Sequence, residues 1–213
     1  LPFPTGESGT GGGVVCINGD DAFIGQPYHS SNTGRVLIYK RNSTGKWEYK
    51  KTINSVIVGT TPAQDREFGC SVSICKDFAV IGEKNSPGNL NRQKGGRVYI
   101  LQRDADGNWE TSKAAGTTSP SVLKGNNVNE LFGSSVAISD PILSQNPSLL
   151  VVGSPGDAGG TISLYRLSNA ANGSISWARI DKKEWSPVGE RFGHAVDISG
   201  DRVIVGAPNA NKV

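Results

Sequence analysis

This chain of 213 residues lacks long apolar stretches, helical periodicity and a large excess of positive or negative charge. No apolar run approaches the roughly 18 residues that cross a membrane as a helix, so we expect no membrane span. The net charge is only +3, which gives no basis for nucleic-acid binding, because that requires basic residues gathered on one face. Composition also excludes collagen, a coiled coil and a disordered tail.

Groups for catalysis are scarce as well. The two histidines, His29 and His194, come without a patterned serine or cysteine nucleophile. The sequence holds no Gly-x-Ser-x-Gly motif, phosphate loop or His-x-x-x-His motif. We therefore expect a protein that is not an enzyme, with no catalytic residue and no cofactor.

Glycine, by contrast, is abundant at 28 residues, and many of the glycines belong to an internal repeat. A Phe-Gly pair opens three copies, at Phe68-Gly69, Phe132-Gly133 and Phe192-Gly193, and a degenerate glycine-rich copy opens the first unit at residue 11. A second apolar run ending in glycine follows each start, and the three complete units add a third run and then Trp47, Trp109 or Trp177. Short runs rich in β-branched residues and bounded by turn residues are typical of strands.

The repeat predicts an all-β fold, a β-propeller of four-stranded antiparallel blades. The expected units are a lead-in at 1–10, blades at 11–67, 68–131 and 132–191, and half a blade at 192–213. We expect the tryptophans to begin the fourth strands and to pack between blades. The glycine ending each second strand should permit either a tight turn or close approach to the next blade.

The fourth unit carries the most complete motif. Phe192-Gly193, followed by Gly206-Ala207-Pro208, resembles an FG-GAP repeat, and the repeats together cover the chain from about residue 11 to its end. Such repeats build the seven-bladed propeller at the head of integrin α subunits and occur in other secreted or surface proteins. By this resemblance the chain holds about 3.5 blades of a probable seven-bladed ring. We expect a piece of a longer protein or a half-ring completed by another chain, so the partner is either a protein or the remaining blades.

Integrin-type blades often bind calcium between their first and second strands. Here that connection is a tight turn with too few carboxylates to supply six to eight oxygen ligands, so we expect no metal. Asp104 and Asp106 begin a calcium-loop pattern and are weak candidates, but no bidentate acid follows at the required spacing. A hairpin turn is the preferred interpretation of this segment.

Two glycosylation sequons begin at Asn42 and Asn172, both at expected hairpin tips. Ordinary turn residues are the alternative. Glycans at these sites would require a secretory pathway, so we expect an extracellular or cell-surface glycoprotein.

The three cysteines, Cys16, Cys70 and Cys75, allow at most one internal disulfide. Cys70 and Cys75 would stand roughly 16 Å apart on one extended strand, too far for a bridge unless the strand bends. A bridge from Cys16 to either of them and buried free thiols both stay open.

The face opposite the sequons is the candidate contact surface, by resemblance to integrin heads. Its candidate residues are Tyr28, His29, Lys84, Arg92, Lys94 and Asp157. The leading hypothesis is a non-enzymatic extracellular module for protein–protein adhesion or structural assembly. A lectin-like propeller and the accessory propeller of a secreted enzyme are the alternatives.

Overall fold

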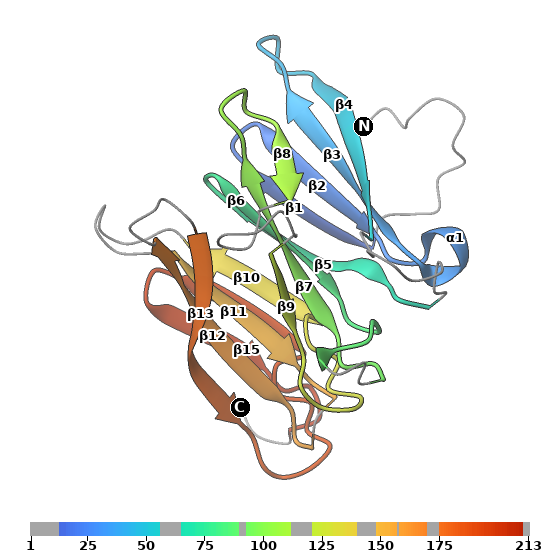
Figure 1. Ribbon diagram of the computed structural model, residues 1–213, viewed down its shortest axis with the longest axis vertical. Helices are drawn as coiled ribbons and strands as arrows, with labels where there is room; N and C mark the ends of the chain where they lie inside the picture. The colour runs from blue at the N-terminus through green and yellow to red at the C-terminus, as the bar shows by residue number, and fades with distance from the viewer. Residues whose placement is uncertain are drawn as a thin grey trace.

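A computed structural model describes residues 13–55, 65–89, 93–111, 121–139, 148–156, 158–169 and 175–210 (Figure 1). The all-β prediction is confirmed, since these residues form fifteen strands and one four-residue helical turn. The strands make four antiparallel sheets, and each sheet is built from one stretch of the chain. Among the residues in these ranges, no helix is long and apolar enough to cross a membrane.

The first sheet has its four strands in chain order. They are β1 (Val14–Asn18), β2 (Asp21–Gln26), β3 (Arg35–Arg41) and β4 (Trp47–Asn54). The turn α1 (His29–Asn32) joins β2 to β3, and its Ser30 and Ser31 have left-handed φ values of 52° and 54°. This segment is therefore a tight reversal of the chain rather than a regular helix.

The second sheet differs from the expected pattern in its fourth strand. It contains β5 (Phe68–Cys75), β6 (Phe78–Glu83), β7 (Arg97–Arg103), β8 (Trp109–Thr111) and β9 (Val122–Lys124). Both β8 and β9 pair antiparallel with β7, at opposite ends of that strand. Two short strands therefore stand where the sequence predicted one.

The third and fourth sheets complete the described fold. The third contains β10 (Ser135–Ser139), β11 (Leu149–Ser154), β12 (Thr161–Asn169) and β13 (Ile175–Glu184), and the fourth contains β14 (Ala195–Ser199) and β15 (Arg202–Gly206). The prediction that Trp177 begins the fourth strand of its unit was wrong, because β13 begins two residues earlier and pairs with β12 from Ile175 onward. Trp47 and Trp109 do begin their strands.

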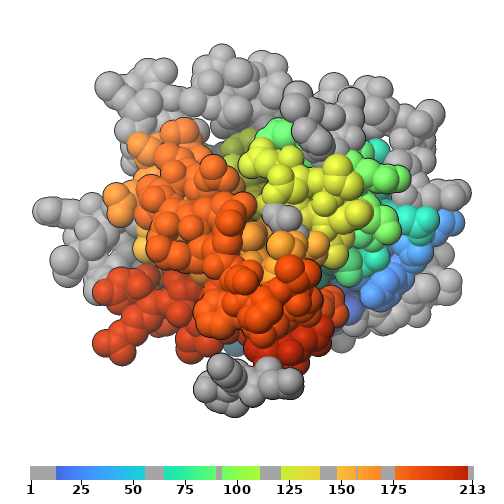
Figure 2. Space-filling view, turned by 90° about the horizontal axis from the view of Figure 1, so that it is seen from below, coloured from blue at the N-terminus to red at the C-terminus, as the bar shows by residue number. Residues whose placement is uncertain are grey.

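The sheets pack face to face, and their first strands lie next to one another in the order β1, β5, β10 and β14. The surface follows the same order, with colours running from blue through green and yellow to orange and red (Figure 2). Apolar layers fill the spaces between successive sheets. The second strands of the two inner sheets, β6 and β11, are buried on both sides, so Ile81 faces the first sheet while its neighbour Val80 faces the third.

The Phe-Gly pairs stand where one sheet gives way to the next. Phe68 and Phe132 are buried and meet Tyr99 and Tyr165, respectively, edge to face. The backbone N–H of Phe68 donates to the carbonyl of Thr33, and that of Phe132 donates to Gly95 in the same way. Each unit is thereby held to the preceding one by main-chain hydrogen bonds as well as by apolar packing.

Candidate functional site

The junction between successive sheets has a recurring geometry at the glycine that ends the second strand. A Cβ atom on Gly25, Gly82 or Gly153 would fall on the carbonyl oxygen of Gly69, Gly133 or Gly193, respectively. A serine secures two of these carbonyls: Ser71 Oγ donates to Gly133 O at 2.7 Å, and Ser135 Oγ donates to Gly193 O at 2.8 Å. Glycine is needed at these positions because the main chain of the next unit occupies the space of a side chain.

The first sheet leaves part of this pattern uncovered, on a surface that we call the leading face: the side of β1 that bears Val15 and Ile17. These side chains are 58% and 61% exposed. At the same repeat positions, Val72 and Ile74 are 7% and 5% exposed because they pack into the layer against the first sheet. On the same side of the first sheet, Ala22 of β2 and Leu37 of β3 are buried.

The fourth sheet has a complementary uncovered surface, which we call the trailing face: the side of the β14–β15 hairpin that bears Ala195, Asp197, Ile204 and Gly206. Ile204 is 75% exposed, whereas Val80 and Val151, at the same repeat position, are fully buried by the following sheet. Around Gly206, the nearest atoms to an added Cβ belong to Ala195, at 3.5 Å or more. The space that the next unit fills in the inner junctions is open here.

Individual junctions carry their own polar or aromatic contacts. Between the first two sheets, the indole N–H of Trp109 donates to Asp21 Oδ1 at 3.0 Å, and Arg103 Nη2 donates to Asp21 Oδ2 at 2.7 Å. The guanidinium of Arg103 lies 4.4 Å from the centre of the Trp109 ring. Between the second and third sheets, Phe78 meets Trp177 edge to face instead.

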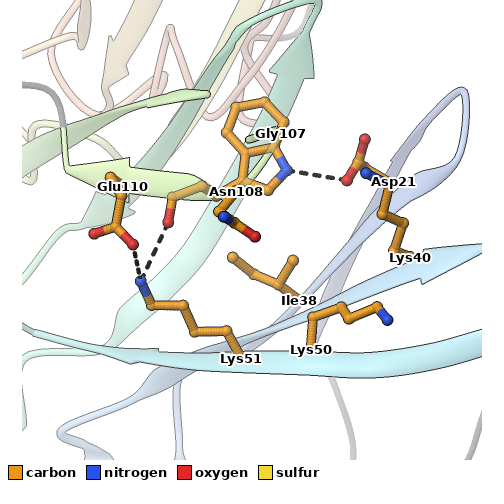
Figure 3. Close-up of a pocket in the computed structure, with 9 residues that line it drawn as sticks. Asp21, Ile38, Lys40, Lys50, Lys51, Gly107, Asn108 and Glu110 are labelled. Atoms are coloured by element: carbon orange, nitrogen blue, oxygen red, sulfur yellow. Dashed lines mark hydrogen bonds and ion pairs between the residues drawn. The ribbon is translucent and has the colours of Figure 1, made fainter. Parts of the chain in front are cut away.

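A pocket of about 450 Å³ opens beside this first junction (Figure 3). Its lining residues are Asp21, Ile38, Lys40, Lys50, Lys51, Gly107, Asn108, Trp109 and Glu110. Lys51 reaches from β4 to Glu110 of β8 at 2.6 Å (Figure 3). Lys50 pairs with Glu48 at 2.8 Å. Trp109 is only 3% exposed, so its ring is not offered for stacking. The pocket presents mixed charge around an isoleucine, and none of the predicted contact residues that the structure describes lines it.

The predicted contact residues are placed in several surroundings. Tyr28 is exposed, and His29 lies half-buried in α1. Lys84 Nζ forms an ion pair with Glu67 Oε2 at 2.7 Å. Partial burial works against its charged form, yet this hydrogen bond and the nearby charges raise the pKa of Lys84. Lys94 is exposed with a left-handed φ of 47°, and Arg92 and Asp157 lie outside the described residues.

A buried carboxyl beneath this surface was missed by sequence reasoning. Glu83 is fully buried between the first two sheets, where Tyr99 Oη donates to its Oε2 at 2.8 Å and Ser55 Oγ donates to its Oε1. Burial raises the pKa of Glu83 despite these donors. The same repeat position in the first sheet holds Gln26, which is also buried and accepts from Arg35 Nε. A polar residue directly after the glycine of strand two was the available signal.

The candidate metal residues lie in the hairpin turn between β7 and β8. Asp104 Oδ1 accepts from the backbone N–H groups of Asp106 and Asn108 at 3.0 and 2.7 Å. The bond from Asn108 is the largest influence lowering the pKa of Asp104. Within the part of the chain that the structure describes, no group of three or more His, Cys, Asp or Glu side chains could hold a metal ion.

Asn42 occupies the equivalent turn of the first sheet. Its Oδ1 accepts from the backbone N–H groups of Thr44 and Lys46, and its Nδ2 donates to Glu48 Oε1 at 2.8 Å. Asn172 lies outside the described residues.

The cysteines Cys16, Cys70 and Cys75 are free thiols. Burial raises the pKa of Cys16 and raises that of Cys70 to about 11. Because the thiolate is the reactive form, neither of these two thiols is activated as a nucleophile at neutral pH.

Models of known protein families and the curated proteins were both searched, and neither search found a match for this chain.

Proposed function

We propose that this chain is a non-enzymatic β-propeller segment of FG-GAP type and that it works outside the cell in protein–protein assembly or adhesion. One observation carries the proposal: the leading and trailing faces leave exposed the apolar positions that the inner junctions bury. Val15, Ile17 and Ile204 stand in water, while their counterparts in the inner sheets pack against a neighbour. Apolar surface of this kind is suited to contact with another unit, either a further blade of the same polypeptide or a partner protein.

The repeated junction supports the propeller part of the proposal. First strands lie side by side at each step from sheet to sheet, and a Phe-Gly turn meets the preceding unit through the same main-chain contacts each time. Sheets added through such contacts form a radial array, which is the arrangement of blades in a propeller. The lectin-like alternative gains no support from the pocket shown in Figure 3. The Trp109 ring beside that pocket is buried, with the Arg103 guanidinium 4.4 Å from its centre, so it is not available to stack on a sugar.

The proposal is tested on the protein isolated from its source under native conditions. We expect it to occur in a particle heavier than its own polypeptide, as measured by light scattering after size-exclusion chromatography. Mild chemical cross-linking followed by peptide mapping should place cross-linked partner peptides beside the leading or trailing face. A particle with the mass of one polypeptide would contradict an assembly function.

A further inference from the structure

A second pocket, of about 440 Å³, opens between the second and third sheets. Two cations line it, Lys124 on β9 and Arg179 on β13, and no acidic side chain among the described residues does so. Asn89, Asn126 and Tyr165 also line it. Because β9 and β13 are edge strands of their sheets, a partner can reach the pocket without parting the two sheets.

The cations of this pocket are not neutralised, unlike the lysine beside the pocket of Figure 3. There, Glu110 holds Lys51 at 2.6 Å. Here, the side chains of Lys124 and Arg179 form no hydrogen bond or ion pair with any other residue that the structure describes. Two basic side chains are therefore available to an incoming anion.

The pairing of β12 with β13 fixes the position of Arg179. It stands directly opposite Tyr165, so both side chains project from the same face of the third sheet. Tyr165 belongs to the apolar layer between the second and third sheets. Burial raises the pKa of Tyr165 to about 12, opposed by the charge of Arg179, so the phenol keeps its proton at neutral pH and adds no negative charge.

The acid Glu130 lies near this site but is already satisfied. Its charge adds to the effect of burial on the pKa of Tyr165. Its carboxylate is buried, and Oε2 accepts from the backbone N–H groups of Asn126 and Asn127 at 2.6 and 2.8 Å. Lys124 and Arg179 outnumber this one acid, so the pocket keeps a net positive charge.

The two amides add a donor and an acceptor beside the cations. Asn89 Nδ2 donates to Asn126 Oδ1 at 2.7 Å. This bond leaves Asn89 Oδ1 and the Nδ2 hydrogens of Asn126 without a partner among the described residues. One acceptor next to one donor is the complement of a peptide group, which presents an N–H and a carbonyl.

We propose that this pocket binds a carboxylate on an acidic, extended segment of a partner protein. The proposal rests on the assembly function described above and names the chemistry of the partner. The planar guanidinium of Arg179 can hold the carboxylate through two parallel hydrogen bonds. Lys124 adds a second positive charge, and the amides of Asn89 and Asn126 are placed to bind the partner's main chain.

A partner protein is favoured over a repeated sugar site because the arginine does not recur. The residues opposite the equivalent positions of the first and second sheets are Tyr49 and Thr111. A lectin-like propeller would need the same polar set in unit after unit. The described site belongs to one junction, as a contact with one particular partner segment would.

The experiment measures binding of a fluorescein-labelled hexaglutamate peptide to the recombinant chain by fluorescence anisotropy. We expect saturable binding at low ionic strength that weakens as salt is added, since salt screens the charges. Arg179→Gln should weaken binding about 10- to 100-fold, the effect of losing hydrogen bonds to a charged group. Lys124→Gln is the independent second variant and should also weaken binding, by about 3- to 10-fold.

Arg166→Gln is the matched control. Arg166 is an exposed arginine of β12 that follows Tyr165 and pairs opposite Ala178, so it projects from the other face of the same sheet. It removes the same charge as Arg179→Gln and should change the affinity less than about 2-fold. Circular dichroism spectra and melting temperatures of all three variants should stay those of wild type.

Three results would overturn the inference. They are no binding of hexaglutamate to the wild type, equal losses in Arg179→Gln and Arg166→Gln, and Arg179-dependent binding of polygalacturonate without binding of the peptide. The last would make an acidic polysaccharide the ligand. The mass of the native particle is measured separately, so a heavy particle combined with no hexaglutamate binding would keep the assembly function and reject the acidic partner segment.

Discussion

The carbonyl oxygen of Gly133 occupies the space that a Cβ atom on Gly82 would need. The two glycines belong to different units, and their main chains approach each other closely, with the Ser71 hydroxyl beside them donating to the Gly133 carbonyl. The φ angle of Gly82 is not left-handed, so glycine is required there by crowding and not by the local conformation of the backbone. Gly206 holds the same repeat position without this neighbour.

Gly82→Ala should therefore destabilise the protein by about 3 kcal/mol, because the methyl group must push the second and third sheets apart. Gly206→Ala is the matched control and should change the free energy of unfolding by less than about 1 kcal/mol. Urea unfolding followed by tryptophan fluorescence measures both. Equal losses in the two variants would contradict the close approach at Gly82.

A second matched pair concerns Ile204 and Val151, which share one repeat position. Val151→Glu should cost more than about 4 kcal/mol or prevent folding, because it places a carboxylate in the layer between the third and fourth sheets. Ile204→Glu should change the free energy of unfolding by no more than about 0.5 kcal/mol, since the side chain already lies in water. Thermal melts at low protein concentration distinguish the two. A large loss at Ile204 would show that the trailing face is covered within the chain.

Glu83 should make stability depend on pH. Its pKa is raised in the folded state by burial, so its protonated form favours folding at low pH. That contribution is fully present below the pKa of about 4.3 of an unfolded glutamate and is lost as the pH rises through the folded value. Glu83→Gln keeps an acceptor for Tyr99 and cannot ionise, so its stability relative to wild type should increase from pH 4 to pH 7.

The measurement is the difference in unfolding free energy between wild type and Glu83→Gln at several pH values. Glu110→Gln, at an exposed glutamate of β8, is the control for a change in net charge. A difference that does not vary with pH would refute the expected titration of Glu83.

Asp21 accepts hydrogen bonds from two groups of the second sheet, so its removal should weaken the first junction. Asp21→Ala leaves the buried indole N–H of Trp109 and the charge of Arg103 without their acceptor, and should cost about 2–4 kcal/mol. Asp20→Ala is the neighbouring control: it breaks an exposed ion pair with Arg41 and should cost less than about 1 kcal/mol. Chemical denaturation of both variants provides the comparison, and similar losses would remove Asp21 from this role.

Glycosylation at Asn42 and Asn172 is tested by intact mass. Protein secreted from eukaryotic cells should lose mass on enzymatic removal of N-glycans, and the double variant Asn42→Gln, Asn172→Gln should not. Each single variant should keep one glycan. At Asn42 the amide nitrogen has two hydrogens and uses one for Glu48, so a glycan is compatible with that bond. No change in mass for the wild-type protein would remove the argument for a secretory route.

The sequence predicted those parts of the fold that depend on local pattern. Runs such as the one around Val151 are β-branched and end in glycine, and the structure has strands at these places. It did not predict the division of a fourth strand into β8 and β9 or the start of β13 at Ile175. These details follow from pairing with β7 and β12, which local residue types do not specify.

The polar contacts of the junctions were also beyond sequence reasoning. Asp21 and Trp109 are 88 residues apart, and no local sequence pattern around either residue predicts their hydrogen bond. Ser55, Arg66 and Tyr99, which come from other parts of the sequence, all interact with the buried Glu83 carboxyl. The contact role of Tyr28 and Lys84 stays a prediction.

The different tryptophan contacts at the first two junctions have a consequence for the order of the sheets. Trp109 faces a carboxylate, whereas Trp177 faces the edge of a phenyl ring and its indole N–H has no hydrogen-bond partner among the described residues. If the order of the repeat units were changed, Asp21 would lose its two hydrogen-bond donors, Trp109 and Arg103. Phe78 would then pack against Trp109, and the neighbouring Arg103 would have no carboxylate to pair with. Each pair of neighbouring sheets therefore has its own specific contacts. Repeat units that look interchangeable in sequence fit together in only one order.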